Sequence, residues 1–169
     1  MTDLYVTWSE YHHKIEKLAF KIHKSNWHFN HIVCLAKGGL RVGDILCRLY
    51  DKPLAIMSTA SYRGKNNRQQ GEIEFSQHLS TIEPLGDRIL LVDDLVDSGV
   101  SLTQSLNWLK NKYSHISDIR TAVIWYKSIS TAIPDYYIDY LPNNPWIHQP
   151  FEIYEQTNIK KLASEFDED

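Results

Sequence analysis

The residues best suited to chemistry lie together in one segment, 89–101. Four apolar residues lead there into three carboxylates: Asp93, Asp94 and Asp97. After them come two hydroxyls, a glycine and an apolar residue: Ser98, Gly99, Val100 and Ser101. Backbone N–H groups, hydroxyls and the start of a helix together favour the binding of a phosphate. Because carboxylates would repel a phosphate unless a sugar or a cation lies between them, the segment predicts a sugar phosphate bound with Mg²⁺.

Each of these residues also has a purely structural interpretation. Asp93 and Asp94 are suited to turns, and Ser98 to the cap of the following helix, since Asp and Ser are common at such positions. Gly99 lets the backbone approach an anion closely. The whole pattern, with strand, acids, turn and helix in this order, is what favours a binding site.

A second glycine turn follows an expected strand at 32–36. It consists of Lys37, Gly38 and Gly39. The glycines leave N–H groups free for an anion and the lysine adds a positive charge. A plain turn between a strand and a helix explains the same residues equally well.

Strands and helices alternate along the chain. A capping box formed by Thr7 and Glu10, followed by apolar residues at helical spacing, predicts a helix over 8–24. Apolar runs predict buried strands, and these lie at 32–36, 53–57, 88–92, 119–125 and, shorter, 137–140. Further helices are expected from Leu40 to about Tyr50 and after Gly99. The order predicts a doubly wound α/β fold with a mainly parallel sheet flanked by helices, in which ligands bind beyond the carboxyl ends of the strands.

Composition places the chain among ordinary globular proteins. Its 169 residues, 43% of them hydrophobic, suffice for a core and are too apolar for a disordered chain. We expect one domain over 1–160 and an acidic, disordered tail over 161–169. With 18 Lys and Arg against 21 Asp and Glu, broad nucleic-acid binding is disfavoured. No apolar run approaches the roughly 18 residues of a membrane helix, so a cytoplasmic location is expected.

The segment from Val92 to Ser101 resembles the phosphoribosyl-pyrophosphate signature of type I phosphoribosyltransferases. That signature is an apolar strand, Asp-Asp, two or three residues, Asp or Thr, a small residue, Gly, any residue, and Thr or Ser. Further matches, from Tyr5 to Phe151, resemble the short bacterial xanthine–guanine phosphoribosyltransferases. They comprise residues 5–8, 37–40, 61–62, 92–99, 127 and 146–151. The resemblance implies the type I phosphoribosyltransferase fold, with a small hood formed largely by residues 136–155.

The resemblance also implies how phosphoribosyl pyrophosphate is held. Asp93 and Asp94 match the acidic pair that holds the ribose hydroxyls and Mg²⁺, and Asp97 matches the general base near purine N7. The cradle for the 5′-phosphate is matched by Ser98, Gly99, Val100 and Ser101. Two of these, at 100 and 101, depart from the usual small residue and Thr, which a backbone cradle tolerates. Residues 37–39 match a pyrophosphate loop that carries a cis peptide bond at its Lys or Arg.

Recognition of the base is implied in the same way. Lys127 matches a lysine that donates to the oxygen at purine C6, and an ammonium group, which has donors only, would reject the amino group of adenine. Trp146 and Ile147 match residues that pack on the purine and present backbone groups to its C2 edge. His148 stands where the bacterial enzymes usually carry Glu, so the preference among xanthine, guanine and hypoxanthine stays open. The structural alternatives are a solvated lysine and a tryptophan in a small hydrophobic hood.

The polar stretch 61–72 predicts a loop, followed by a hairpin around 72–78. Ser61 and Tyr62 open this loop. In the family that the chain resembles, such a loop closes over phosphoribosyl pyrophosphate and excludes water. The alternative is an ordinary surface loop.

The function that the resemblance implies is purine salvage. The 5-phosphoribosyl group would pass from phosphoribosyl pyrophosphate to a 6-oxopurine (xanthine, guanine or hypoxanthine), with release of pyrophosphate, in a homodimer or homotetramer that requires Mg²⁺. The alternative is a regulator of the same fold that binds phosphoribosyl pyrophosphate or a nucleotide, and nucleic acid, without catalysis. The nearly neutral body and the presence of Asp97 and Lys127 favour the enzyme.

Overall fold

The computed structural model describes residues 3–61 and 73–166, without the side chain of Ser61. The chain divides into two compact units, one of residues 1–13 with 145–169 and one of Lys14–Asn144. The larger unit includes residues 136–144, which the sequence analysis assigned to the hood. They belong there because most of them form a strand of the main sheet.

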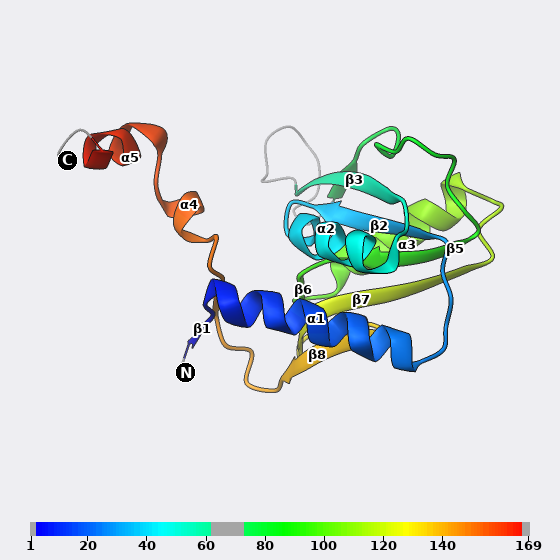
Figure 1. The fold of residues 1–169 in the computed structure, drawn as a ribbon, viewed down its shortest axis with the longest axis horizontal. Helices are drawn as coiled ribbons and strands as arrows, with labels where there is room; N and C mark the ends of the chain where they lie inside the picture. The colour runs from blue at the N-terminus through cyan, green and yellow to red at the C-terminus, as the bar shows by residue number, and fades with distance from the viewer. Residues whose placement is uncertain (1–2, 62–72, 167–169) are drawn as a thin grey trace. The chain divides into compact units, whose positions relative to one another are not determined.

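A seven-stranded sheet is the centre of the larger unit (Figure 1). Its strands are β2 (His31–Ala36), β3 (Leu54–Ser61), β4 (Ile73–Phe75), β5 (Arg88–Val92), β6 (Leu95–Val96), β7 (Asp118–Lys127) and β8 (Tyr136–Leu141). Neighbours follow the order β4-β3-β2-β5-β7-β6, and β8 also pairs with β7. All of these pairs are parallel except β3–β4. The expectation of a mainly parallel sheet is therefore confirmed. The hairpin expected around 72–78 is not formed within that segment, since it contains the single strand β4, which pairs with β3.

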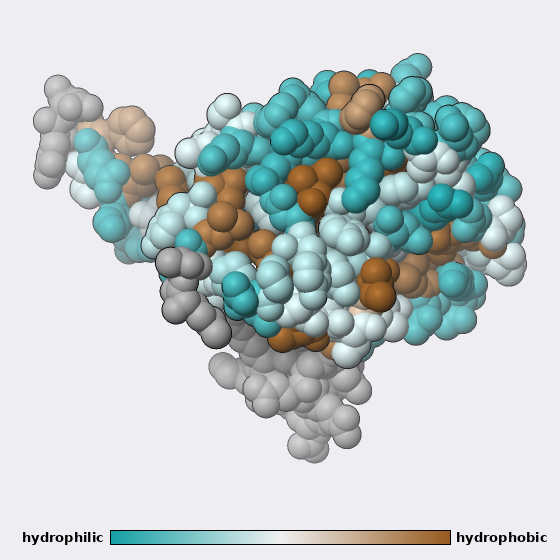
Figure 2. Space-filling view, turned by 90° about the horizontal axis from the view of Figure 1, so that it is seen from below, coloured by the Kyte–Doolittle hydropathy of each residue, from teal (hydrophilic) through white to brown (hydrophobic). Residues whose placement is uncertain are grey.

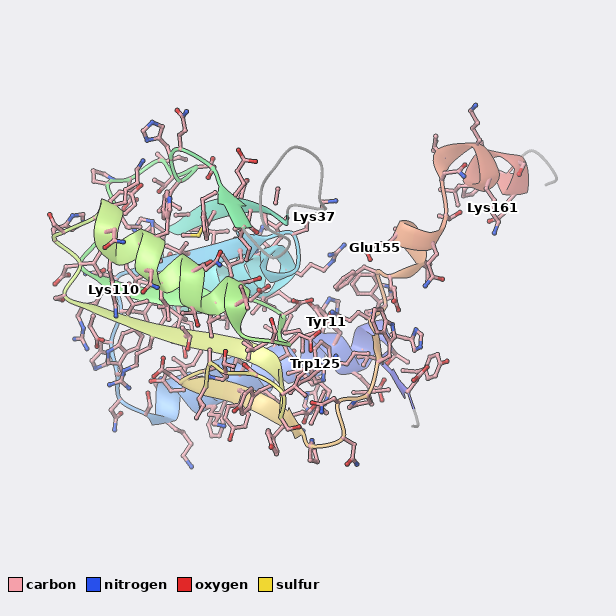
Figure 3. The ribbon with its side chains drawn as sticks, turned by 180° about the vertical axis from the view of Figure 1, so that it is seen from behind. Tyr11, Lys37, Lys110, Trp125, Glu155 and Lys161 are labelled. Atoms are coloured by element: carbon pink, nitrogen blue, oxygen red, sulfur yellow. The ribbon has the colours of Figure 1, made fainter. Side chains whose placement is uncertain are left out.

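Helices cover both faces of this sheet. In Figures 1 and 3, α2 (Gly39–Tyr50) and the residues of α1 (Trp8–Lys24) from Lys14 onward lie on one face, and α3 (Val100–Lys112) lies on the other. Helix α1 has the bounds that the periodicity predicts. Its capping box forms as expected, because the Thr7 N–H donates to Glu10 Oε2 (2.8 Å) and the Glu10 N–H donates to Thr7 Oγ1 (3.2 Å).

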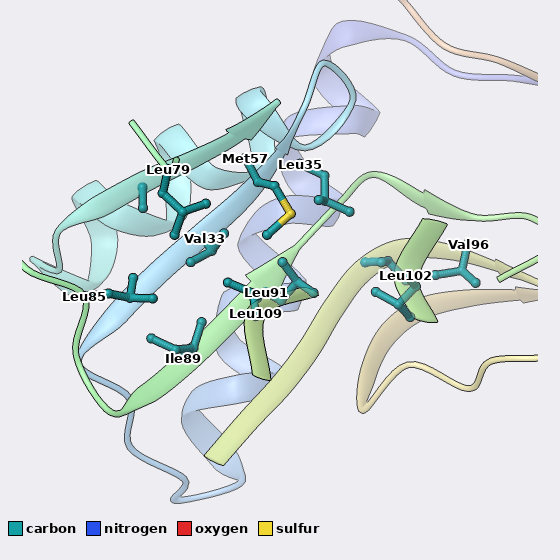
Figure 4. Packing of buried hydrophobic residues seen from close by; sticks show 12 residues of the cluster. Val33, Leu35, Met57, Leu79, Leu85, Ile89, Leu91, Val96, Leu102 and Leu109 are labelled. Atoms are coloured by element: carbon teal, nitrogen blue, oxygen red, sulfur yellow. The ribbon is translucent and has the colours of Figure 1, made fainter. Parts of the chain in front are cut away.

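The core of the larger unit lies between the sheet and α3 (Figure 4). Val33 and Leu35 of β2 reach it together with Ile89 and Leu91 of β5, since alternate residues of a strand share one face. The intervening residues are buried as well, on the face that α2 covers. Burial of one such side chain stabilises the fold by about 1.5–3 kcal/mol. The strands are thus buried on both faces, as their uninterrupted apolar runs predict.

The smaller unit joins the two ends of the chain. Two short strands, β1 (Leu4–Tyr5) and β9 (Ile147–His148), pair in parallel, and two helices follow them, α4 (Ile153–Gln156) and α5 (Ile159–Phe166). The Leu4 N–H donates to the Trp146 carbonyl (2.8 Å), and the Val6 N–H donates to the His148 carbonyl (3.1 Å). The sequence pattern predicts neither strand. It predicts a disordered acidic tail from residue 161, where the structure has α5 as far as Phe166.

The face seen in Figure 2 carries hydrophobic side chains in small, separate patches between hydrophilic ones. Exposed hydrophobic residues of the larger unit include Phe20, Leu49 and Ile82. Within residues 3–61 and 73–166, no helix combines the length and the apolar character needed to cross a membrane.

Candidate active site

The acidic pair lies where β5 ends. Backbone hydrogen bonds fix it against β7: the Asp93 N–H donates to the Ala122 carbonyl (3.2 Å), and the Asp94 carbonyl accepts from Ile124 N (3.0 Å) and Trp125 N (3.1 Å). The Asp94 N–H also donates to Asp93 Oδ1 (2.9 Å). Burial of its carboxyl group, and then the negative charge of Asp94, raise the pKa of Asp93 well above its ordinary value. A cation held by these residues would offset the negative charge that contributes to this shift.

These two carboxylates suit a Mg²⁺ ion that water and substrate also coordinate, rather than a metal ion held by protein side chains alone. Within the described part of the chain, no three His, Cys, Asp or Glu side chains are grouped so that they could hold a metal ion. Mg²⁺ usually binds one or two carboxylates and completes its shell with water and substrate phosphates. Asp93 and Asp94 therefore fit a Mg²⁺ that arrives with a phosphorylated ligand.

The third carboxylate is placed by a strand that the sequence analysis missed. Strand β6 pairs with β7 in a register that sets Val96 opposite Tyr126, so the next residues, Asp97 and Lys127, lie side by side. Lys127 Nζ lies 3.4 Å from Asp97 Oδ1. The lysine is buried and the aspartate is exposed. Lys127 is thus not a solvated lysine beyond a strand but the last residue of β7, with its ammonium group held beside a carboxylate.

The turn after Asp97 has the features of an anion site. Gly99 has a φ of 86°, a left-handed conformation that favours glycine, and it directly precedes α3. Gly99 has no side chain to cap the helix, and the Val100 N–H donates to Ser98 Oγ (3.4 Å). A helix start of this kind, with further backbone N–H groups in its first turn, favours the binding of an anion. A hollow of about 140 Å³ lies here, lined by Asp93, Asp94, Leu95, Val96, Asp97, Ser98, Gly99, Ser101 and Leu102. Val100 is exposed and does not line it.

The glycine turn after β2 packs directly on the end of β5. A Cβ atom at Gly38 would lie 2.4 Å from Asp94 Oδ1, and one at Gly39 would lie 2.6 Å from the Val92 carbonyl oxygen. Only glycine permits this approach at both positions. The Ala36–Lys37 peptide bond is cis, which confirms the expectation drawn from the resemblance. Lys37 itself is exposed at the end of the sheet (Figure 3).

The structure brings most of the expected residues together. The carboxyl ends of the parallel strands β2, β5, β6 and β7 place the glycine turn 37–39, the acidic pair, the turn 97–101 and Lys127 at one edge of the sheet. Ser61 ends β3, and its side chain lies outside the described residues, as does all of Tyr62 with the loop that it opens.

Trp146 and Ile147 belong to the smaller unit. Ile147 is buried in β9, whereas Trp146 is 59% exposed and its Nε1 donates to Glu152 Oε1 (2.9 Å). His148 lies beside them, with Nε2 3.0 Å from Asp3 Oδ2 and Nδ1 2.9 Å from Glu152 Oε2. The ring of Tyr5 stacks on His148, with the ring centroids 4.3 Å apart. No sequence motif indicates this network, because its members lie at opposite ends of the chain.

The family model and the similar solved structures agree with one another. A model of the phosphoribosyl transferase domain matches residues 7–156. Among solved structures, a purine phosphoribosyltransferase from Pyrococcus horikoshii is 26% identical, with a TM-score of 0.72 over 89% of this chain and 94% of that one. A xanthine-guanine-hypoxanthine phosphoribosyltransferase from Helicobacter pylori is 22% identical, with a TM-score of 0.75 over 96% and 99%. A hypoxanthine phosphoribosyltransferase from Staphylococcus aureus is 17% identical, with a TM-score of 0.63 over 81% and 76%.

Proposed function

The chain belongs to the phosphoribosyltransferase family of pentosyl-transferring enzymes, and we propose that it transfers the 5-phosphoribosyl group from phosphoribosyl pyrophosphate to a 6-oxopurine. One observation carries the proposal: the ammonium group of Lys127 lies 3.4 Å from the carboxylate of Asp97, and Asp97 lines a hollow suited to a phosphate. A donor and a proton acceptor at this spacing suit neighbouring oxygen and nitrogen atoms of an oxopurine. The purine phosphoribosyltransferases among the similar structures support the choice of base class.

The phosphoribosyl end of the substrate fits the acidic pair and the two turns. The N–H groups and hydroxyls of residues 98–101 hold the 5′-phosphate, and Asp93 and Asp94 hold the ribose hydroxyls and Mg²⁺. Residues 37–39 bind the pyrophosphate, with Lys37 offsetting part of its charge. When bound, Mg²⁺ supplies positive charge to the departing pyrophosphate. Catalysis then depends mainly on positioning and on fixed charges.

Transfer requires one bond to break and one to form. A purine nitrogen bonds to C1 of the ribose as the bond from C1 to the pyrophosphate oxygen breaks, and the bonding electrons leave with pyrophosphate. Asp97 accepts the proton that the purine gives up. A positioned general base of this kind contributes about 10²–10⁴-fold to the rate. The exposure of Asp97 in the free protein leaves its carboxylate open to the incoming base.

Lys127 selects the base by its hydrogen-bonding character. Its ammonium group donates to a carbonyl oxygen at C6 and cannot accept from an amino group there, so adenine is rejected. We assign to Trp146 the packing against the face of the purine, and to the backbone of Ile147 the contacts at the C2 edge of the purine. His148, which is held by two carboxylates, bears on the choice among xanthine, guanine and hypoxanthine.

We also propose that the enzyme is a homodimer or a homotetramer. The aromatic strands at the end of the sheet support an interface there, since Tyr126 of β7 packs between Tyr137 and Tyr140 of β8, and Tyr140 remains exposed. Sedimentation at assay concentration tests this, and a monomer would contradict it.

Pyrophosphate release tests the proposed function. Purified protein is incubated with phosphoribosyl pyrophosphate and Mg²⁺ and with xanthine, guanine, hypoxanthine, adenine, uracil or orotate in separate reactions. Release is expected with one or more of the three 6-oxopurines and not with the other three bases. Binding of phosphoribosyl pyrophosphate without release from any base would contradict the proposal and favour a regulator.

A further inference from the structure

We propose that Thr131 is a positioning residue that fixes the phosphate-binding turn from behind. This inference rests on the proposed function, because it concerns the turn at 98–101. Thr131 lies on the surface, outside the residues that line the hollow, and it reaches the turn only through hydrogen bonds.

The connection between β7 and β8, residues 128–135, is a short crossover. It leaves the end of β7 and returns to start β8, which pairs with β7 in parallel from Ala122 opposite Tyr136 to Lys127 opposite Leu141. The chain therefore runs back along most of the strand pair within eight residues, past the start of α3. A connection as short as this has few conformations once its ends are fixed.

Both ends of the crossover are anchored, one to the residues that follow β8 and the other to β7. At one end, Ser128 Oγ donates to the Pro142 carbonyl (2.9 Å) and the Ile129 N–H donates to Asn144 Oδ1 (3.2 Å). At the other end, Asp135 Oδ2 accepts from the N–H (2.7 Å) and the hydroxyl (2.9 Å) of Thr121. The middle of the crossover is thus held at a set distance from the turn that follows Asp97.

Thr131 binds that turn with two donors. Its N–H donates to the Ser98 carbonyl oxygen over 3.0 Å, and its hydroxyl donates to the same oxygen over 3.2 Å. In a trans peptide unit the C=O and the following N–H point in opposite directions. By holding the Ser98 carbonyl, Thr131 turns the Gly99 N–H away from the crossover, toward the side of the turn that a phosphate would occupy.

Packing at Gly99 gives independent support. A Cβ atom there would lie 2.6 Å from Ser130 Oγ and 2.7 Å from Ala132 N. Ser130 Oγ in turn accepts from the Ala132 N–H (3.1 Å) and donates to its carbonyl (2.7 Å). Residues 130–132 therefore form a rigid turn in direct contact with the phosphate-binding turn, on both sides of the Thr131 hydrogen bonds.

The crossover also links the residues that act on the two ends of the proposed substrate. Lys127, which faces the base, and Thr131, which holds the phosphate turn, are four residues apart in the chain. They act on adjacent residues, because Lys127 pairs with Asp97 and Thr131 pairs with Ser98. The spacing between the base and the 5′-phosphate is thereby set by one short segment.

The test compares Thr131→Val, which removes the hydroxyl and keeps the N–H and the branched shape, with Thr131→Ser, which keeps the hydroxyl. Thr81→Val is the matched control, since Thr81 is also an exposed threonine and its hydroxyl donates to the Glu83 carbonyl (3.0 Å) rather than to that of Ser98. Ribose 5-phosphate and inorganic pyrophosphate are titrated separately into each protein by calorimetry. Loss of one hydrogen bond predicts that Thr131→Val weakens ribose 5-phosphate binding about three- to tenfold.

The other measurements separate positioning from general damage. Pyrophosphate binding should be unchanged in all variants, and Thr131→Ser and Thr81→Val should bind ribose 5-phosphate within about twofold of the wild type. In turnover assays, Thr131→Val should raise the KM for phosphoribosyl pyrophosphate while kcat stays nearly constant.

Two results would overturn this role for Thr131 alone. One is wild-type affinity for ribose 5-phosphate in Thr131→Val, and the other is an equal loss of affinity for both probes. A wild-type protein that binds neither probe would overturn the proposed function itself.

Discussion

Lys127 and Asp97 form an ion pair whose two members have very different environments. Their nearest atoms, Nζ and Oδ1, are 3.4 Å apart, and the side chain of Lys127 is 8% exposed whereas that of Asp97 is 55% exposed. The pair joins the last residue of β7 to the residue after β6, so the register of two strands sets its geometry. A ligand can reach the carboxylate from solvent while the ammonium group stays fixed beneath it. The pair is therefore positioned before any substrate binds.

Removal of the ammonium group should abolish the distinction between oxo and amino bases. Lys127→Gln keeps a hydrogen-bonding side chain that can donate or accept, so adenine is no longer rejected. Loss of a charged hydrogen bond costs about 1.5–3 kcal/mol, which predicts a fall of roughly 10- to 150-fold in kcat/KM for the preferred 6-oxopurine. Steady-state kinetics with that base and with adenine measures the change.

The matched control for this prediction is Lys110→Gln. Lys110 is an exposed lysine of α3, remote from the proposed base site (Figure 3). Its kinetics should equal those of the wild type. An unchanged ratio of kcat/KM between oxopurine and adenine in Lys127→Gln would remove Lys127 from base selection.

A methyl group at Gly38 should disturb the acidic pair. In Gly38→Ala the new Cβ would lie 2.4 Å from Asp94 Oδ1, so the carboxylate must move. We expect a higher Mg²⁺ requirement and a KM for phosphoribosyl pyrophosphate raised by about tenfold or more, since placement errors of about 1 Å are costly in active sites. Titration of Mg²⁺ in the pyrophosphate-release assay measures both.

Gly86→Ala is the control for the general effect of placing a Cβ atom too close to a side-chain oxygen. Its Cβ would lie 2.1 Å from Asn30 Oδ1, before the amino end of β5 and away from the site. This variant should lose thermal stability and keep its Mg²⁺ requirement. If Gly38→Ala loses only stability, the glycine turn has no part in binding.

His148 should stabilise the smaller unit in a pH-dependent way. Hydrogen bonding to Asp3, and then to Glu152, raises the pKa of His148 above 6.5. The folded protein therefore holds the proton more tightly than the unfolded chain, so the stabilisation is complete below pH 6.5 and is lost as the pH rises through the raised pKa. The difference in thermal midpoint between the wild type and His148→Gln should shrink accordingly.

NMR titration of the His148 ring provides the control. Asp3→Asn removes the largest cause of the shift, so the pKa of His148 should fall toward 6.5 in that variant. A midpoint difference that stays constant across this pH range would show that the contacts of His148 do not depend on its charge.

The sequence predicted the long elements of the fold and not the short ones. Helix α1 and the strands β2, β5 and β7 follow from apolar periodicity, because burial on one or both faces decides which residues they can contain. Strands β1, β6 and β9 have two residues each, too few for any periodicity, and only pairing with a distant segment defines them. The hood was extended over 136–141 because the sequence cannot show that β8 returns in parallel beside β7.

In the candidate site too, features within one segment could be predicted, and contacts between segments could not. The segment 93–101 and the glycine turn 37–39 were found because their residue types have few uses in that order. Their mutual contact, with Gly38 against Asp94, required the adjacency of β2 and β5. Thr131 had no signal at all, since an exposed threonine in a loop is common and its contact with Ser98 depends on the path of the crossover.

The most direct test of the account is pyrophosphate release by Asp97→Asn. The asparagine has nearly the same shape and cannot accept the purine proton, so kcat should fall by about 10²–10⁴-fold with the preferred 6-oxopurine. The KM for phosphoribosyl pyrophosphate should stay within about twofold of the wild-type value, because the cradle at 98–101 is retained. A variant that keeps the wild-type kcat would contradict the central claim that Asp97 takes up the proton during phosphoribosyl transfer.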